Sequence, residues 1–289
     1  MRFEYLEPGS IAEAVSLLDE YGDSARVIAG GTDLLLQLRS KKIKPDYLVD
    51  IQEIPGLDGI KVTDRGVTIG AMTPVRTLET SAEIKRTLPV LASAAGSIGS
   101  VAIRNVATIG GNLCRAASST DSAPALIGLQ ASVRIAGPAG ERTLPLESFF
   151  TGPGQSALAG NEMLVEVRVP LPERDTRAAY FKHAYRGSID LAIVGVAVVA
   201  GFAPGGKECR EVRVVLGAGA PTPLRARQCE DILRGKEWDE TLIGRAAELA
   251  AGEARPRPDS ARASAAYRKE MVRVFVGRAL RAVSAPPVR

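Results

Sequence analysis

The spacing of apolar residues along the chain alternates between the period of a helix and that of a strand. Apolar positions in 10–22 follow the helical period, with Ser10 placed to cap the first turn and Gly22 at the end, which predicts a helix. β-branched residues gather in short segments that predict strands, and a second helix is expected between them. These segments are the strands 25–30 and 47–51 and the helix 33–42, which begins at Thr32 or Asp33.

The middle of the chain predicts two hairpins with helices between them. The first hairpin spans 59–75 and turns at 64–66; the second spans 131–146 and turns at 137–140. Helical patterns fill 73–99, and the strand 163–172 ends in prolines.

After Pro172 the organisation changes. The segments 177–202 and 209–220 predict antiparallel strands, with an apolar stretch between them that could be helix or strand. Helices are expected at 227–235, 241–254 and 261–283. We place boundaries near residues 52 and 177, which divides the chain into 1–52, 53–177 and 178–289.

Composition and charge narrow the class of protein. The 289 residues are 45% apolar and 24% charged, as in an ordinary soluble globular protein of two domains or three small ones. The net charge of +4 comes from dispersed basic residues, and only 4% of residues are aromatic, so nucleic acid is not an expected partner. No apolar run is long enough for a membrane span, and Glu4 and Glu7 do not fit a signal peptide. We therefore expect a cytoplasmic protein.

Cysteine and histidine are too sparse for several kinds of site. Cys114, Cys209 and Cys229 lie far apart, which fits neither a disulfide framework nor a zinc or iron–sulfur motif. His183 is the single histidine, so a Ser-His-Asp triad or a site with two histidine ligands is nearly excluded. We expect no metal ligands and no catalytic side chain on this chain.

Two double-glycine loops carry the strongest chemical signal. Gly30-Gly31 follows an apolar stretch and precedes Thr32-Asp33, while Gly110-Gly111 follows the β-branched stretch 107–109 and precedes Asn112. Backbone N–H groups in such loops can approach an anion with no Cβ in the way, and two loops that face each other could hold the two halves of a pyrophosphate. Each loop alone fits a simple turn better.

Other nucleotide-binding motifs are absent from the sequence. Neither loop reads G-x-G-x-x-G, and there is no P-loop lysine motif. Gly217-Ala218-Gly219 follows a predicted strand, but Pro221 and Pro223 prevent the helix that a dinucleotide fold needs there.

The two loops together, AGGTDLLLQLR and TIGGNLCRAASSTDSAPAL, resemble the FAD-binding medium subunits of the molybdenum hydroxylases, the xanthine dehydrogenase family. FEYLEPGSIAEAVSLL, IGAMTPVRTLE, FFTGPGQSALAGNEMLVEVRVP and GAGAPTPLRA extend the resemblance over nearly the whole chain. It implies an α+β protein: a two-part FAD-binding fold of the vanillyl-alcohol-oxidase type, followed by a C-terminal sheet-and-helix domain. FAD would lie between the parts 1–52 and 53–177.

The resemblance also implies which residues contact FAD. The first loop would wrap the pyrophosphate with N–H groups and the Thr32 hydroxyl, and the second loop would do the same from the middle domain. The implied contacts are Val27, Ile28, Ala29, Gly30, Gly31, Thr32, Asp33, Leu34, Thr108, Ile109, Gly110, Gly111, Asn112, Asp121, Leu164 and Lys182. Asp121 could instead cap a helix, Leu164 could be a core residue, and Lys182 a surface lysine.

Two departures bear on the family member. Carbon monoxide dehydrogenase medium chains have a histidine where this chain has Thr32, which argues against that member. Hydroxybenzoyl-CoA reductase subunits insert a cysteine-rich segment after the second loop, whereas here Cys114 runs directly into RAASSTDSAPAL. We therefore expect no iron–sulfur cluster on this chain.

The implied function is electron transfer within a larger enzyme. The chain would take electrons from a [2Fe–2S] small subunit and pass them from FAD to an external acceptor, beside a large subunit that holds the molybdenum cofactor, in a heterotrimer or a dimer of heterotrimers. Two other hypotheses stay open: a free-standing flavin oxidoreductase with its own substrate, and a scaffold that has lost FAD.

Overall fold

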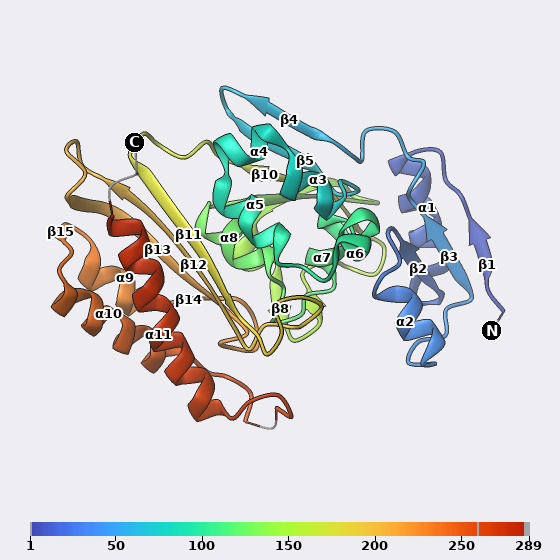
Figure 1. Cartoon of the computed structure of the whole chain (residues 1–289). Helices are drawn as coiled ribbons and strands as arrows, with labels where there is room; N and C mark the ends of the chain where they lie inside the picture. Colours follow the sequence, from blue (N-terminus) through green and yellow to red (C-terminus); the bar gives the residue numbers. More distant parts are fainter. Residues whose placement is uncertain (1, 259, 286–289) are drawn as a thin grey trace.

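The computed structural model describes residues 2–258 and 260–285. It divides into a small N-terminal part, a middle part built on an antiparallel sheet, and a C-terminal sheet covered by helices (Figure 1). No helix in the described part of the chain is both long and apolar enough to cross a bilayer.

The N-terminal part is a three-stranded parallel sheet with the order β1-β3-β2. The predicted first helix is confirmed: the Ser10 hydroxyl accepts the N–H of Glu13 at 3.2 Å, and the helix buries Ala14, Val15 and Leu18 against the sheet. The elements are β1 (Glu4–Leu6), α1 (Ile11–Tyr21), the 3₁₀ turn Gly22–Ser24, β2 (Ala25–Ile28), α2 (Leu34–Arg39) and β3 (Tyr47–Asp50).

The middle part is a five-stranded antiparallel sheet with the order β4-β5-β10-β6-β7. Both predicted hairpins are confirmed, and the predicted strand β10 (Met163–Val169) lies at the centre between them. The hairpin strands are β4 (Ile60–Thr63), β5 (Gly66–Gly70), β6 (Ser132–Gly137) and β7 (Gly140–Pro145); β8 (Phe150–Gly152) and β9 (Gln155–Ser156) form a small separate pair.

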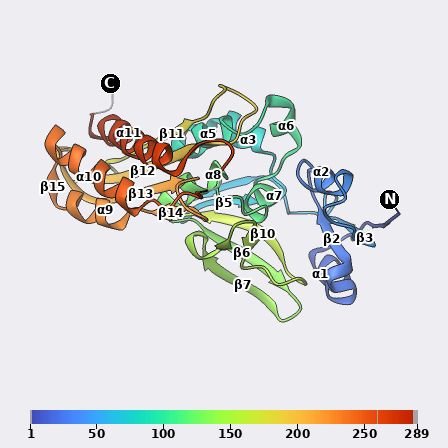
Figure 2. The same ribbon diagram turned by 90° about the horizontal axis from the view of Figure 1, so that it is seen from below.

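Short helices cover this sheet. They are α3 (Val75–Thr80), α4 (Ala82–Thr87), α5 (Pro89–Gly96), α6 (Val101–Val106), α7 (Ile109–Cys114) and α8 (Ser122–Gly128), with a 3₁₀ turn at Leu146–Ser148. All seven residues of α8 are buried, because it lies between this part and the C-terminal sheet (Figure 2).

In the C-terminal part, β11 (Thr176–His183), β12 (Val194–Phe202) and β13 (Glu208–Gly217) form an antiparallel sheet, which β14 (Leu224–Arg225) and β15 (Lys236–Glu237) extend. The apolar stretch that could have been helix or strand is β12. All nine of its residues are buried, because helices cover both faces, so it shows no alternation. The outer helices are α9 (Arg227–Leu233), α10 (Glu240–Glu253) and α11 (Ala265–Ser284).

The β-branched stretch 107–109 is not a strand. It forms only an isolated bridge between Thr108 and Pro74, and α7 begins at Ile109. The Thr108 hydroxyl caps this helix by accepting the N–H of Gly111 at 3.1 Å. The second double glycine therefore lies inside the first turn of a helix and not in a loop that follows a strand.

Candidate functional site

A cavity of about 360 Å³ lies between the loop after β2 and the start of α7. The N-terminal part forms one wall and the middle part the other. An ion pair between Asp33 and Arg115, with Oδ1 and Nε 3.2 Å apart, connects the two walls. Most residues singled out from the sequence line the cavity: Val27, Ala29, Gly30, Gly31, Thr32, Asp33, Leu34, Thr108, Gly110, Gly111, Asn112 and Leu164.

The first glycine loop presents a run of unbonded backbone donors to the cavity. The N–H groups from Gly30 to Asp33 donate to no residue that the structure describes. Gly31 has a φ of +68°, and its carbonyl accepts the N–H of Leu35 at 2.9 Å, which closes the turn. Consecutive free N–H groups of this kind form a concave site for an anion.

Gly30 is also where the two walls touch. A Cβ at this position would lie 1.8 Å from the carbonyl oxygen of Val106, a distance at which the backbones would have to separate. The missing side chain therefore sets how closely the N-terminal part approaches α6 and α7.

The N–H groups of the second double glycine are already bonded within the protein. Ile109 and Gly110 donate to the carbonyls of Thr73 and Ala71 at 3.0 and 2.8 Å, and the N–H of Gly111 is bonded to its cap. A Cβ on Gly110 would lie 2.7 Å from the Ala71 carbonyl oxygen. This segment thus packs α7 closely against the residues after β5, while the first loop keeps its donors free.

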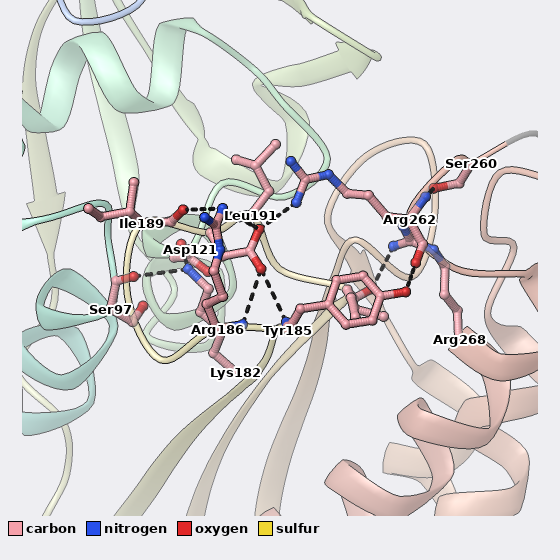
Figure 3. A network of polar contacts seen from close by, with 12 residues as sticks. Ser97, Asp121, Lys182, Tyr185, Arg186, Ile189, Leu191, Ser260, Arg262 and Arg268 are labelled. Carbon is pink, nitrogen blue, oxygen red and sulfur yellow. Dashed lines mark hydrogen bonds and ion pairs between the residues drawn. The ribbon is translucent and has the colours of Figure 1, made fainter.

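Asp121 and Lys182 lie outside the lining of the cavity and contact each other (Figure 3). The Asp121 carboxylate lies 2.7 Å from the Lys182 ammonium and accepts the Tyr180 hydroxyl at 2.8 Å. Lys182 also donates to the carbonyl of Ser97 at 2.9 Å, and the next residue, Ile98, lines the cavity. Lys182 is thus a partly buried member of a network and not a free surface lysine.

The alternative interpretation of Asp121 as a helix cap holds for its position but not for its side chain. Asp121 stands at the N-cap position of α8, but its side chain makes no capping bond and turns to Lys182 instead. Burial raises the pKa of the Asp121 carboxyl, although Lys182 and Tyr180 offset part of this effect. Burial, together with the neighbouring carboxylate, raises the pKa of Tyr180 well above its usual value.

Ile28 and Ile109 also lie outside the lining and pack into the core. The sequence argument missed a further set of lining residues, most of them apolar. Cys114 and Arg115 lie within the second motif, and Arg26, Gln37, Ala107 and Met163 lie in or next to segments already singled out, so that proximity could have found them; the others come from scattered elements with no local signal. These others are Ile51, Ala71, Met72, Ile98, Ile103, Leu158 and Glu162.

The three cysteines are separate free thiols. Burial raises the pKa of Cys114, which lines the cavity, to about 12, so its thiol stays protonated at neutral pH. Among the described residues, no group of three or more acidic, cysteine or histidine side chains is arranged to hold a metal ion.

Comparison with known proteins agrees with this geometry over the whole chain. Residues 1–172 match the family described as the FAD binding domain in molybdopterin dehydrogenase, and residues 179–283 match the CO dehydrogenase flavoprotein C-terminal domain. The carbon monoxide dehydrogenase medium chain of Hydrogenophaga pseudoflava is 37% identical over 97% of this chain and 96% of its own length. The xanthine dehydrogenase FAD-binding subunit of Escherichia coli O157:H7 is 33% identical over 94% and 92%.

Solved structures are similar to the same extent. A chain of the Hydrogenophaga pseudoflava carbon monoxide dehydrogenase that lacks the Mo-pyranopterin moiety superposes with a TM-score of 0.94, covering 98% of this chain and 97% of its own. A chain of quinoline 2-oxidoreductase from Pseudomonas putida 86 is 29% identical, with a TM-score of 0.91 and coverage of 98% and 97%.

The fold and the cavity define an FAD-binding oxidoreductase subunit whose FAD-binding part precedes a sheet-and-helix domain. More closely, the chain belongs to the family of FAD-binding medium subunits of the molybdenum hydroxylases, the xanthine dehydrogenase family. The resemblance seen in the two glycine motifs is thereby confirmed. Relatives named for carbon monoxide and for xanthine are 37% and 33% identical to this chain.

Proposed function

We propose that this subunit accepts electrons from a [2Fe–2S] partner subunit and passes them to an external acceptor, in an assembly that also contains a molybdenum-cofactor subunit. The observation that carries the proposal is the similarity over 97% of the chain to a protein named as a medium chain of carbon monoxide dehydrogenase. The chain has only three cysteines, whereas a [2Fe–2S] cluster takes four thiolates. A heterotrimer or a dimer of heterotrimers would bring the missing cluster beside the cavity.

FAD fits the donors that the cavity presents. A pyrophosphate needs several donors on one side, and the unbonded N–H groups from Gly30 to Asp33 supply them. From the other wall we assign side chains in place of N–H groups: the Thr108 hydroxyl and the Asn112 amide. The Asn112 Oδ1 accepts the Ser122 hydroxyl at 2.6 Å, which holds this amide in place. The bound FAD supplies the capacity to store two electrons and release them one at a time.

Lys182 and Asp121 are proposed to position the inner wall. The Lys182 ammonium holds the Ser97 carbonyl, and with it the backbone that leads into Ile98, while Asp121 holds Lys182 in place. Because the ammonium lies just behind the lining, its positive charge would also favour electron-rich states of the bound group.

An anaerobic experiment separates this function from a free-standing flavin oxidoreductase. Candidate aldehydes and N-heterocycles are added to the isolated, FAD-loaded chain, and the visible flavin band is followed. We expect no bleaching, because the chain has no group of its own to oxidise these substrates. Dithionite should bleach the same sample, which serves as the control for a reducible flavin.

The experiment is then repeated with the cluster and molybdenum subunits added. Bleaching by a substrate only in the complete mixture supports the proposal. Bleaching of the isolated chain by a substrate would show that this chain oxidises substrates itself. A purified chain without a flavin band, even after incubation with FAD, would instead support a scaffold that has lost the cofactor.

A further inference from the structure

A second cavity, of about 390 Å³, lies where the C-terminal part meets the loop after α7. It shares no lining residue with the FAD cavity. Its most distinctive feature is a group of three arginines and three serines. The full lining is Ser118, Ser119, Leu191, Ala192, Ala218, Ala220, Arg257, Ser260, Ala261, Arg262 and Arg268.

Arg268 is a buried cation in an unfavourable place. Its side chain belongs to the first turn of α11, where the helix dipole disfavours positive charge, and the residue is only 7% exposed. One Nη donates to the carbonyl of Ile193 at 2.6 Å, and the other donates to the Ser260 hydroxyl at 2.9 Å. The Nε has no partner, and no carboxylate of the described residues contacts this guanidinium.

The surroundings add positive charge to this buried group. Arg257 and Arg262 line the same cavity, and burial, together with the charges of Arg262 and Arg257, lowers the pKa of Arg268. Among the described residues, Asp190 pairs with Arg262, with its Oδ1 2.5 Å from the guanidinium. Figure 3 shows Arg268 beside Ser260, while the Arg262 side chain extends away from them toward Asp190, to which its Nη1 donates.

The two loop serines complete the set of donors. Ser118 and Ser119 are half-buried, and the Ser118 carbonyl accepts the N–H of Ala218 at 2.6 Å, which fixes this loop against the C-terminal sheet. Guanidinium groups and hydroxyls are the usual donors to phosphate oxygens. A carboxylate has two oxygens to share among these donors, whereas a phosphate group has three and carries more charge.

We propose that this second cavity binds the phosphate group of a small molecule, with Arg257, Arg262 and Arg268 as the cationic donors and Ser118 and Ser119 as the neutral ones. The anion would lie beside the buried Arg268 guanidinium and offset its charge. Since a buried charge is costly unless it is paired, the site explains why a cation is kept in the first turn of α11.

The test uses the FAD-loaded full chain, so that the FAD pyrophosphate site is already filled. Titration calorimetry with inorganic phosphate should show saturable binding at one site per chain. Arg257→Gln should weaken this binding about tenfold, as expected for one lost charge-assisted hydrogen bond. Ser119→Ala should weaken it less. Arg255→Gln removes the same charge from the same exposed segment outside the lining, and should change the affinity less than about twofold.

A competition experiment identifies the source of the phosphate group. If a nucleoside monophosphate binds more tightly than inorganic phosphate and displaces it, the ligand is a phosphate ester. If inorganic phosphate binds more tightly, the ligand is the free ion. Either result supports the site. Three results would overturn the proposal. The first is no saturable heat on titration with phosphate, and the second is an Arg255→Gln variant that weakens phosphate binding as much as Arg257→Gln does. The third is loss of phosphate binding when partner subunits assemble through Arg257. The last result would assign the arginines to a carboxylate of a partner.

Discussion

Four glycines at the FAD cavity meet four different steric demands. Gly31 adopts a φ that side chains rarely allow, Gly30 lets two backbones touch, and Gly110 lets α7 approach Ala71. Gly111 is the open one, because a Cβ there would meet only the Thr108 hydroxyl, at 3.0 Å. The motifs could be found in the sequence, but these roles could not, since each depends on a neighbour from a distant part of the chain.

Substitutions at Gly30 and Gly111 should therefore act differently. We expect Gly30→Ala to lower both the FAD affinity and the thermal midpoint of the apo chain, because overpacking against Val106 costs about 1–3 kcal/mol. Gly111→Val should abolish FAD binding and lower the apo midpoint less than Gly30→Ala does, because its Cβ would press on the Thr108 hydroxyl and not on backbone.

The measurements are FAD titration and thermal unfolding of the apo protein. Gly244→Ala in α10 is the control, since a Cβ there meets nothing within 4 Å; it should leave the FAD affinity unchanged and raise the midpoint slightly, because alanine favours a helix interior. Stoichiometric FAD in Gly111→Val would remove Gly111 from the site.

At the scale of the element, the two glycine segments look alike in sequence and differ in structure. The first is a loop with free N–H groups, and the second is the start of a helix whose N–H groups bond to Ala71, Thr73 and Thr108. Local patterns predicted the hairpins and most helices, because their apolar periods and turn residues lie close together in the chain. They did not indicate the helix that begins at Ile109, where bonds to the residues after β5 fix the conformation.

Hydrogen exchange can distinguish the two segments. Adding FAD should slow the exchange of the amides from Gly30 to Asp33 by more than about tenfold, because these N–H groups gain acceptors. The amides from Ile109 to Asn112 should change less than about twofold, because they are already bonded without the cofactor. Protection gained mainly in the second segment would show that its bonds rearrange when FAD binds.

At the scale of the whole molecule, the middle and C-terminal parts share one hydrophobic core. Leu126 and Ile127 of α8 belong to the same buried cluster as Val199 and Val215 of the C-terminal sheet. The domain boundary near residue 177 was inferred from the sequence pattern alone, and it stays a prediction. The sequence could not predict this shared core. The pattern of apolar residues indicates which residues are buried, but it does not indicate which other elements they pack against.

A shared core should make these parts unfold together. A Cβ on Gly128 would lie 2.9 Å from Val199, so Gly128→Ala should lower the unfolding midpoint by the equivalent of about 1–3 kcal/mol. Trp238, the single tryptophan, reports on the C-terminal part, and circular dichroism reports on the whole chain. Both signals should shift together.

Gly252→Ala, where a Cβ meets nothing within 4 Å, is the control. A Trp238 transition that stays in place while the other signal shifts would contradict a common unfolding unit.

The burial of α8 between two sheets also limits how related subunits can be recombined. A hybrid gene joined near residue 175 would pair α8 from one parent with β12 and β13 from the other, and at 37% identity their contact surfaces would seldom match. A junction near residue 52 leaves that contact within one parent and divides a smaller cluster, in which the middle part contributes Ile54, Leu57, Ala136, Met163 and Val165. Hybrids that fold and function, whether made in the laboratory or by evolution, should therefore have their junction in the N-terminal part of the chain.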